Sequence, residues 1–240
     1  MRSEAQVAAY TGRLREAREL YRRSAELSQR RGFKESAALT LALEASAEAE
    51  FGNATAARER VKEALAILRG VNVEALSAQA LALSGDLRQA QELADDLGRR
   101  FPTDTLVNAV DVPIIRGTIE LERGNAARTI EFLQAAAPYE SGFGGVGAIY
   151  PRGQAYLRLG KGNEAAAEFQ KILDHDRAGL SFTVAPVHAL AHLGLARAYV
   201  VAGDGVKSRK AYQDFLALWK DADADIPILQ QAKAEYAKLK

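Results

Sequence analysis

The 240-residue sequence has no cysteine, so disulfide bonds and thiolate metal sites are excluded. No apolar run approaches the roughly 20 residues that a membrane-spanning helix needs, and the N-terminus lacks the apolar stretch of a secretory signal. The 32 lysines and arginines nearly balance the 31 aspartates and glutamates, which leaves no excess of positive charge for nucleic-acid phosphates. These absences predict a soluble, cytoplasmic protein with no membrane span and no nucleic-acid partner.

The sequence does contain a repeating pattern of small residues. Six glycines recur at intervals of 33 to 43 residues, which is typical of helical repeats, and a small residue follows each glycine five positions later. The glycines are Gly12, Gly52, Gly85, Gly124, Gly160 and Gly203. The small residues are Ala17, Ala57, Ala90, Thr129, Ala165 and Ser208. Each glycine is predicted to turn the chain from one helix into the next through left-handed backbone, and the small residue to let the two helices approach closely.

A residue on the same helical face stands nine positions after each glycine, and it is usually large and apolar. These residues are Tyr21, Val61, Ala94, Leu133, Phe169 and Tyr212. The pattern predicts an all-α fold, an α-solenoid of about six helical hairpins in a single domain over residues 1–240. The predicted hairpins span about 1–31, 33–70, 71–101, 103–137, 145–176 and 183–221.

A last helix is predicted over 226–240, beyond the sixth hairpin. A repeat array needs such an end helix to cover its last apolar face. The facing stripes are Tyr212, Phe215, Leu216 and Trp219 on the sixth hairpin, and Ile228, Leu229, Ala232, Tyr236 and Leu239 on the last helix. Asp225 is predicted as the N-cap of this capping helix, with Pro227 in its first turn.

The repeats resemble the tetratricopeptide repeat, whose turn glycine is followed by a small residue at five, a large apolar residue at nine and often a proline at seventeen. The matching residues are Gly85, Ala90 and Pro102, then Gly160, Ala165 and Phe169, with Tyr156 and Tyr199 at a tyrosine position four before the glycine. The chain departs from the family at the twelfth position after the glycine and in its longer repeats. The resemblance implies a right-handed superhelix that binds a protein or peptide partner in its concave groove.

A second resemblance concerns the segments LGRRFP, AAAPYE and EFQKILDH and the C-terminal stretch AYQDFLALWKDADADIPILQQAKAEYAKL. They are similar to the tetratricopeptide tails that follow the kinase domain in bacterial eukaryotic-like serine/threonine protein kinases. The kinase's own motifs are absent, since there is no H-R-D loop, and Asp214 and Phe215 are followed by Leu216 instead of glycine. The resemblance implies a regulatory or sensing tail in signalling, with no catalytic residue in this chain.

A polar residue stands six positions before each turn glycine, where the family geometry places the concave face. These candidate partner-binding residues are Gln6, Ser46, Gln79, Thr118, Gln154 and Arg197. They are interpreted either as a hydrogen-bonding ladder for a partner segment or as the chance polarity of a solvated surface. A small-ligand or nucleotide sensor and a homo-oligomerisation module are the alternatives, and the identity of the partner is not encoded.

Three further motifs are rejected as sites. The stretch from Gly142 to Gly147 spells G-x-G-x-x-G, but no strand precedes it, so a flexible linker is the better interpretation. His188 and His192 have the spacing of two zinc ligands, yet neither a following glutamate nor a cysteine completes a zinc site. The acidic run over 221–225 lacks the glycine and the closing glutamate of a calcium loop. We therefore expect no metal and no cofactor.

Overall fold

The computed structural model describes residues 1–140, 146–177 and 185–239, and within these ranges the chain is all-helical with no strand. The helices up to the middle of the chain are α1 (Arg2–Tyr10), α2 (Leu14–Arg30), α3 (Lys34–Glu50), α4 (Ala54–Ile67), α5 (Val71–Leu83), α6 (Leu87–Arg100), the π-helix η1 (Val107–Asp111) and α7 (Val112–Glu122). They are followed by α8 (Ala126–Gln134), the 3-10 turn η2 (Ala137–Tyr139), α9 (Val146–Arg158), α10 (Gly162–Arg177), α11 (Ala185–Val201), α12 (Gly205–Leu218) and α13 (Pro227–Ala237). None of the described helices is long and apolar enough to cross a membrane.

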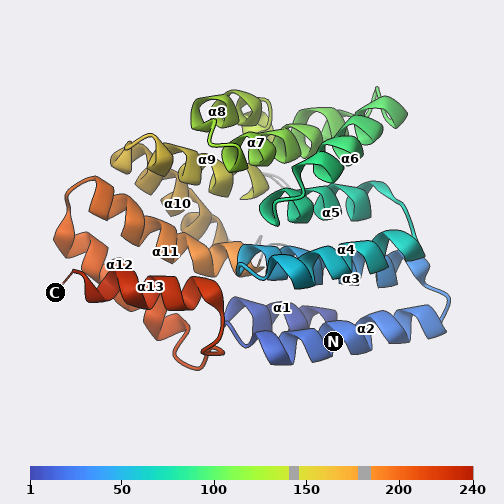
Figure 1. Cartoon of the computed structure of the whole chain (residues 1–240), viewed down its shortest axis with the longest axis horizontal. Helices are drawn as coiled ribbons and strands as arrows, with labels where there is room; N and C mark the ends of the chain where they lie inside the picture. Colours follow the sequence, from blue (N-terminus) through green and yellow to red (C-terminus); the bar gives the residue numbers. More distant parts are fainter. Residues whose placement is uncertain (141–145, 178–184, 240) are drawn as a thin grey trace.

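The odd-numbered helices form a closed inner layer. From α3 to α11 each packs against the next odd-numbered helix, and α11 then packs against α1 and α3. The even-numbered helices each pack against their neighbours in the chain and lie outside this layer. Figure 1 accordingly shows the N-terminal helices, in blue, beside the C-terminal helices, in red. The first and last parts of the chain therefore meet, which the sequence pattern did not predict.

The backbone expected at the six turn glycines is confirmed. All six have a positive φ, between 71° and 89°, which is the left-handed conformation that glycine adopts at little cost. The small residues five positions later are all completely buried. The two polar ones among them are satisfied across the helix pair, because Thr129 Oγ1 donates to the Gly117 carbonyl (3.1 Å) and Ser208 Oγ donates to the Ala196 carbonyl (3.0 Å).

Phe169 of α10 fills a slot that exists only because two glycines face its ring. A Cβ atom added at Gly153 of α9 would lie 2.8 Å from the ring, and one added at Gly194 of α11 would lie 2.6 Å from it. Phe169 itself is completely buried. These separations are too short for carbon atoms, so the close packing of α9, α10 and α11 depends on the absence of both side chains.

Gly194→Ala is therefore expected to lower the free energy of unfolding by about 1–3 kcal/mol, because a methyl group forced against a buried ring overpacks the core. The matched control is Gly205→Ala at the start of α12, where an added Cβ meets nothing within 4 Å. This control should change stability by no more than about 0.5 kcal/mol. Denaturant titration followed by circular dichroism measures both variants, and equal effects would refute the packing argument.

Trp219, the only tryptophan, joins the two ends of the chain. Its indole Nε1–H donates to the carbonyl of Tyr10 at the end of α1 (2.9 Å), and its ring meets Phe51 after α3 edge-on, with centroids 5.0 Å apart. Phe215 of α12 packs on the same ring at 4.9 Å. The expected contact between the aromatic stripe of α12 and the apolar stripe of α13 is confirmed, since both belong to one buried cluster. Trp219 also contacts the ends of α1 and α3, which the sequence analysis did not predict.

The loop between α12 and α13 also bonds the turn between α1 and α2. The Asp223 N–H donates to the Gly12 carbonyl (3.0 Å), and the Asp223 carboxylate accepts from the Arg15 backbone N–H in the first turn of α2 (2.7 Å). The prediction that Asp225 is the N-cap of α13 is wrong. Ile226 occupies that position, and the Asp225 carboxylate pairs instead with the Arg15 guanidinium (3.0 Å).

Candidate functional site

A small cavity lies at the centre of the inner layer. Its volume is about 50 Å³, and three of the six candidate partner-binding residues line it, namely Gln6 of α1, Ser46 of α3 and Gln79 of α5. Tyr150 of α9 and Glu50 of α3 contribute the other polar groups. The rest of the wall is mainly apolar and comes from Tyr21, Leu43, Ala47, Leu76, Gly147, Pro151, Pro186 and Val187. A water molecule occupies about 30 Å³ in the liquid, so the cavity holds one or two groups of that size.

The other three candidate residues are placed differently. Thr118 is completely buried, and its Oγ1 donates to the Ile114 carbonyl one turn earlier (2.9 Å). Gln154 is half-buried and influences the pKa of the Tyr150 phenol, which it lowers against the larger effect of burial. The Arg197 guanidinium forms two hydrogen bonds to the Glu235 carboxylate of α13 (2.9 and 3.0 Å). The positions six before the glycine thus face the interior, but Thr118 and Arg197 already have partners within the chain.

Glu50 is the unusual group of the cavity. Its Oε2 is buried, and it makes no hydrogen bond or ion pair within the described residues. Burial raises the pKa of its carboxyl group to about 8. Glu50 is also the last residue of α3, where the negative end of the helix dipole disfavours a carboxylate further. Sequence reasoning missed this residue, although a glutamate at the end of the alanine-rich stretch over 37–51 was a detectable signal.

Two other glutamates of α3 have different environments. Glu48 is almost completely buried and is held by Arg18 of α2 through two hydrogen bonds (2.5 and 2.8 Å). Glu44 has a buried Oε2 without a hydrogen bond in the described part of the chain. Burial raises the pKa of Glu44 to about 7, and the nearby Arg60 opposes this effect. Neither residue lines the cavity, so Glu44 is a matched control for Glu50 on the same helix.

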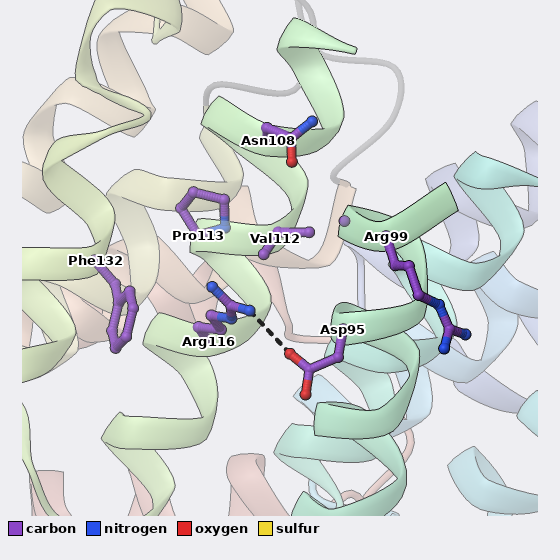
Figure 2. A pocket seen from close by; sticks show the side chains of 8 residues that line it. Asp95, Arg99, Asn108, Val112, Pro113, Arg116 and Phe132 are labelled. Atoms are coloured by element: carbon purple, nitrogen blue, oxygen red, sulfur yellow. Dashed lines mark hydrogen bonds and ion pairs between the residues drawn. The ribbon is translucent and has the colours of Figure 1, made fainter. Parts of the chain in front are cut away.

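A larger cleft, which we call the outer cleft, opens between α6, α7 and α8. Its volume is about 450 Å³, and it is lined by Asp95, Gly98, Arg99, Asn108, Val112, Pro113, Arg116 and Phe132. Figure 2 shows Phe132 on one side and Asp95 on the other, with the guanidinium of Arg116 directed toward the Asp95 carboxylate. These two groups form an ion pair of 2.9 Å.

The π-helix η1 shapes one end of the outer cleft. The Val112 N–H donates to the Val107 carbonyl, five residues earlier instead of the usual four. Pro113 follows directly and has no N–H to continue the helical ladder, which accounts for a local change of hydrogen-bond pattern at this point. The Asn108 side chain donates to the carbonyls of Phe101 (2.7 Å) and Asp104 (2.8 Å), which holds η1 against the end of α6. Pro113 was the available sequence signal for this irregularity.

The outer cleft combines an apolar wall with positive charge. Phe132, Val112 and Pro113 form the apolar part. Arg116 lies inside, Arg99 is exposed at the rim, and Arg128 stacks over the Phe132 ring at 5.7 Å from its centroid. Among the described residues of the lining, the one carboxylate is that of Asp95, which already accepts from Arg116 and Gln91. Arg99 pairs with Asp96 of its own helix (2.5 Å). With Arg99, Arg116 and Arg128 beside two carboxylates, the cleft favours a group that is apolar and negatively charged.

The glycine-rich stretch and the histidine pair were rejected as sites from the sequence. Residues 141–145, which contain most of the G-x-G-x-x-G stretch from Gly142 to Gly147, lie outside the described residues. His188 is buried in α11. In the ranges that the structure describes, no three histidine or acidic side chains come together in a way that could hold a metal ion.

Comparison with known proteins adds no assignment. No model of a known protein family matches the chain, and no curated protein sequence matches it.

Proposed function

We propose that this chain is a non-catalytic protein-binding module built from tetratricopeptide-like helix pairs, and that its partner docks in the outer cleft. The resemblance to kinase tails extends the proposal to a regulatory tail of a bacterial signalling kinase that acts in the cytoplasm. One observation carries the location of the docking site. The outer cleft has a volume of about 450 Å³ and a mixed apolar and cationic lining, which suits one or two side chains of a partner segment.

The small volume of the central cavity argues against docking along the six candidate partner-binding residues. A cavity of about 50 Å³ does not admit a peptide. Arg197, the one charged residue among the six candidates, is engaged by Glu235 of the same chain. Of the six candidate residues, Gln6 and Thr118 are buried and the other four are half-buried, so a partner segment would reach only part of the set.

The chemistry of the outer cleft defines the partner segment. An aliphatic or aromatic side chain would pack against Phe132 and Pro113. A neighbouring carboxylate would replace Asp96 as the partner of Arg99, or Asp95 as the partner of Arg116. Arginine and aromatic residues are the residue types most often found at the centres of protein interfaces. We therefore propose an acidic partner segment with one apolar anchor residue.

Fluorescence anisotropy with labelled synthetic peptides tests this proposal. The peptides carry one leucine or phenylalanine flanked by glutamates, and matched peptides carry lysines in place of the glutamates. Acidic peptides should bind, and Phe132→Ala should weaken this binding about tenfold or more because it removes the apolar wall. Arg99→Glu should weaken it several-fold and reduce its dependence on salt, since it reverses a charge at the rim.

Arg88→Glu is the matched control. Arg88 lies on α6 like Arg99, is equally exposed and pairs only with Glu92 of its own helix, but it does not line the cleft. It should leave peptide affinity within about twofold of the unchanged chain. If Arg88→Glu weakens binding as much as Arg99→Glu does, attraction is non-specific and the cleft is not the docking site.

A further inference from the structure

We propose that the central cavity is a binding site for a small primary alkylammonium ion, with the Glu50 carboxylate as its counter-ion. The inference concerns the inner layer and does not depend on the outer cleft. It begins from a buried polar atom without a partner, because Oε2 of the Glu50 carboxyl group, in the cavity wall, has no cation or hydrogen-bond donor beside it among the described residues.

The polar groups around the cavity are suited to a donor ligand. Glu50 offers two carboxylate oxygens, and Gln6 and Gln79 each offer an amide oxygen. Ser46 Oγ donates to the Ala42 carbonyl (3.2 Å), so the lone pairs of this oxygen are available to a ligand. An ammonium group is a compact donor with no acceptor function, and it would satisfy several of these oxygens at once.

Electrostatics at this point favour a cation and disfavour an anion. Glu50 ends α3, where the helix dipole is negative, and the described residues of the cavity wall include no lysine or arginine. The cation that influences the wall residue Tyr150 is Arg197, and it is paired with Glu235. The other titratable groups among the lining residues described are the phenols of Tyr21 and Tyr150, which burial keeps neutral by raising their pKa values. A bound cation would therefore supply a positive partner that Glu50 lacks within the described part of the chain.

Size and polarity restrict the ligand further. A volume of about 50 Å³ accommodates one or two water-sized groups, as in methylammonium, but not a quaternary ammonium with four methyl groups. The wall is mainly apolar and includes the Glu50 carboxyl group, which suits a ligand with a charged head and a short alkyl end. Two rings, Tyr21 and Tyr150, lie within the wall and add favourable contact with a cation.

Thermal unfolding of the complete chain in sodium phosphate tests the inference, with methylammonium chloride compared against sodium chloride at equal ionic strength. A ligand of two non-hydrogen atoms binds no tighter than roughly millimolar. At about 100 mM, methylammonium should raise the melting temperature by about 2–4 °C. The shift should be larger at pH 9 than at pH 6, because Glu50 must lose its proton before it can pair with the cation.

Three variants and two further salts decide the outcome. Glu50→Gln should abolish the shift, and Glu44→Gln, which changes a comparable buried carboxyl on α3 outside the cavity, should retain it. Gln79→Met removes one acceptor from the wall and should reduce the shift. A shift that persists in Glu50→Gln would overturn the inference. Equal shifts with potassium would overturn the ammonium assignment, and equal shifts with tetramethylammonium would show that the ligand binds outside the cavity.

Discussion

Glu50→Gln is expected to stabilise the protein by a few kcal/mol at pH 8 and to change its stability little at pH 4. The unfolded chain releases the Glu50 proton near the ordinary value of 4.5, whereas burial in the folded state raises the pKa to about 8. Between these two pH values the unfolded state binds fewer protons than the folded state, so stability falls as the pH rises. The full shift corresponds to roughly 2–5 kcal/mol at about 1.4 kcal/mol per pH unit, reduced by the cost of a buried glutamine amide.

Urea titrations at pH values from 4 to 9, in buffers free of amines, measure this dependence. Glu44→Gln should show the same direction over a narrower range, because the pKa of Glu44 is raised only to about 7. The surface control Glu59→Gln on α4 should stay within about 0.5 kcal/mol throughout. If Glu50→Gln destabilises the chain equally at every pH, the Glu50 carboxylate has a stabilising partner. The inference that this group lacks a partner in the cavity would then be wrong.

Trp219→Ala is expected to lower the free energy of unfolding by about 3–5 kcal/mol, the range for deleting a large buried aromatic side chain. The loss includes the edge-on contact with Phe51 and the hydrogen bond to the Tyr10 carbonyl. Denaturant titration must be followed by circular dichroism, because the variant has no tryptophan left to report. Backbone hydrogen exchange at Asp223 and Arg15 should accelerate at the same time, since their N–H groups bond across the junction between the two ends of the chain.

Trp219→Phe separates the contribution of the aromatic ring from that of the indole hydrogen bond. It keeps an aromatic ring but removes the indole N–H, so about 1–2 kcal/mol should be lost. Phe33→Ala, at an exposed aromatic residue before α3, serves as the surface control and should change stability by no more than about 0.5 kcal/mol. An effect of Trp219→Ala as small as that of Phe33→Ala would mean that the two ends of the chain are not held together in solution.

The turns and the contacts within each helix pair could be predicted because they depend on residues close together in the chain. Left-handed glycine at a turn and a small residue five positions later are requirements of backbone geometry and of helix contact, so the pattern in the sequence carries them directly. Their positive φ values and complete burial match the prediction at all six positions. Gly32 also has a positive φ and was not predicted, although Ala37, five positions later, is small and completely buried like the other six; this glycine turns the chain from α2 into α3, between two of the predicted hairpins.

For the candidate partner-binding residues, spacing in the sequence predicted the direction of the side chain but not its partners. The interval from each glycine placed Gln6, Ser46 and Gln79 on an inward face, and all three do line the central cavity. The same interval could not reveal that Thr118 is bonded to its own helix or that Arg197 is held by Glu235, 38 residues away. Polarity at a fixed position does not distinguish a free donor from one already satisfied. That distinction depends on which distant side chains arrive nearby.

The sequence by itself determined the all-helical class, the turn positions and the residues that pack within each helix pair, because these follow from interactions between residues close in the chain. The contacts of α11 with α1 and α3, the ion pair of Asp225 with Arg15 and the place of Glu50 in the wall of the central cavity follow only from how distant helices pack. These features depend on the small rotation between successive helix pairs. Added over the whole chain, that rotation determines whether the two ends meet, and no single repeat contains this information.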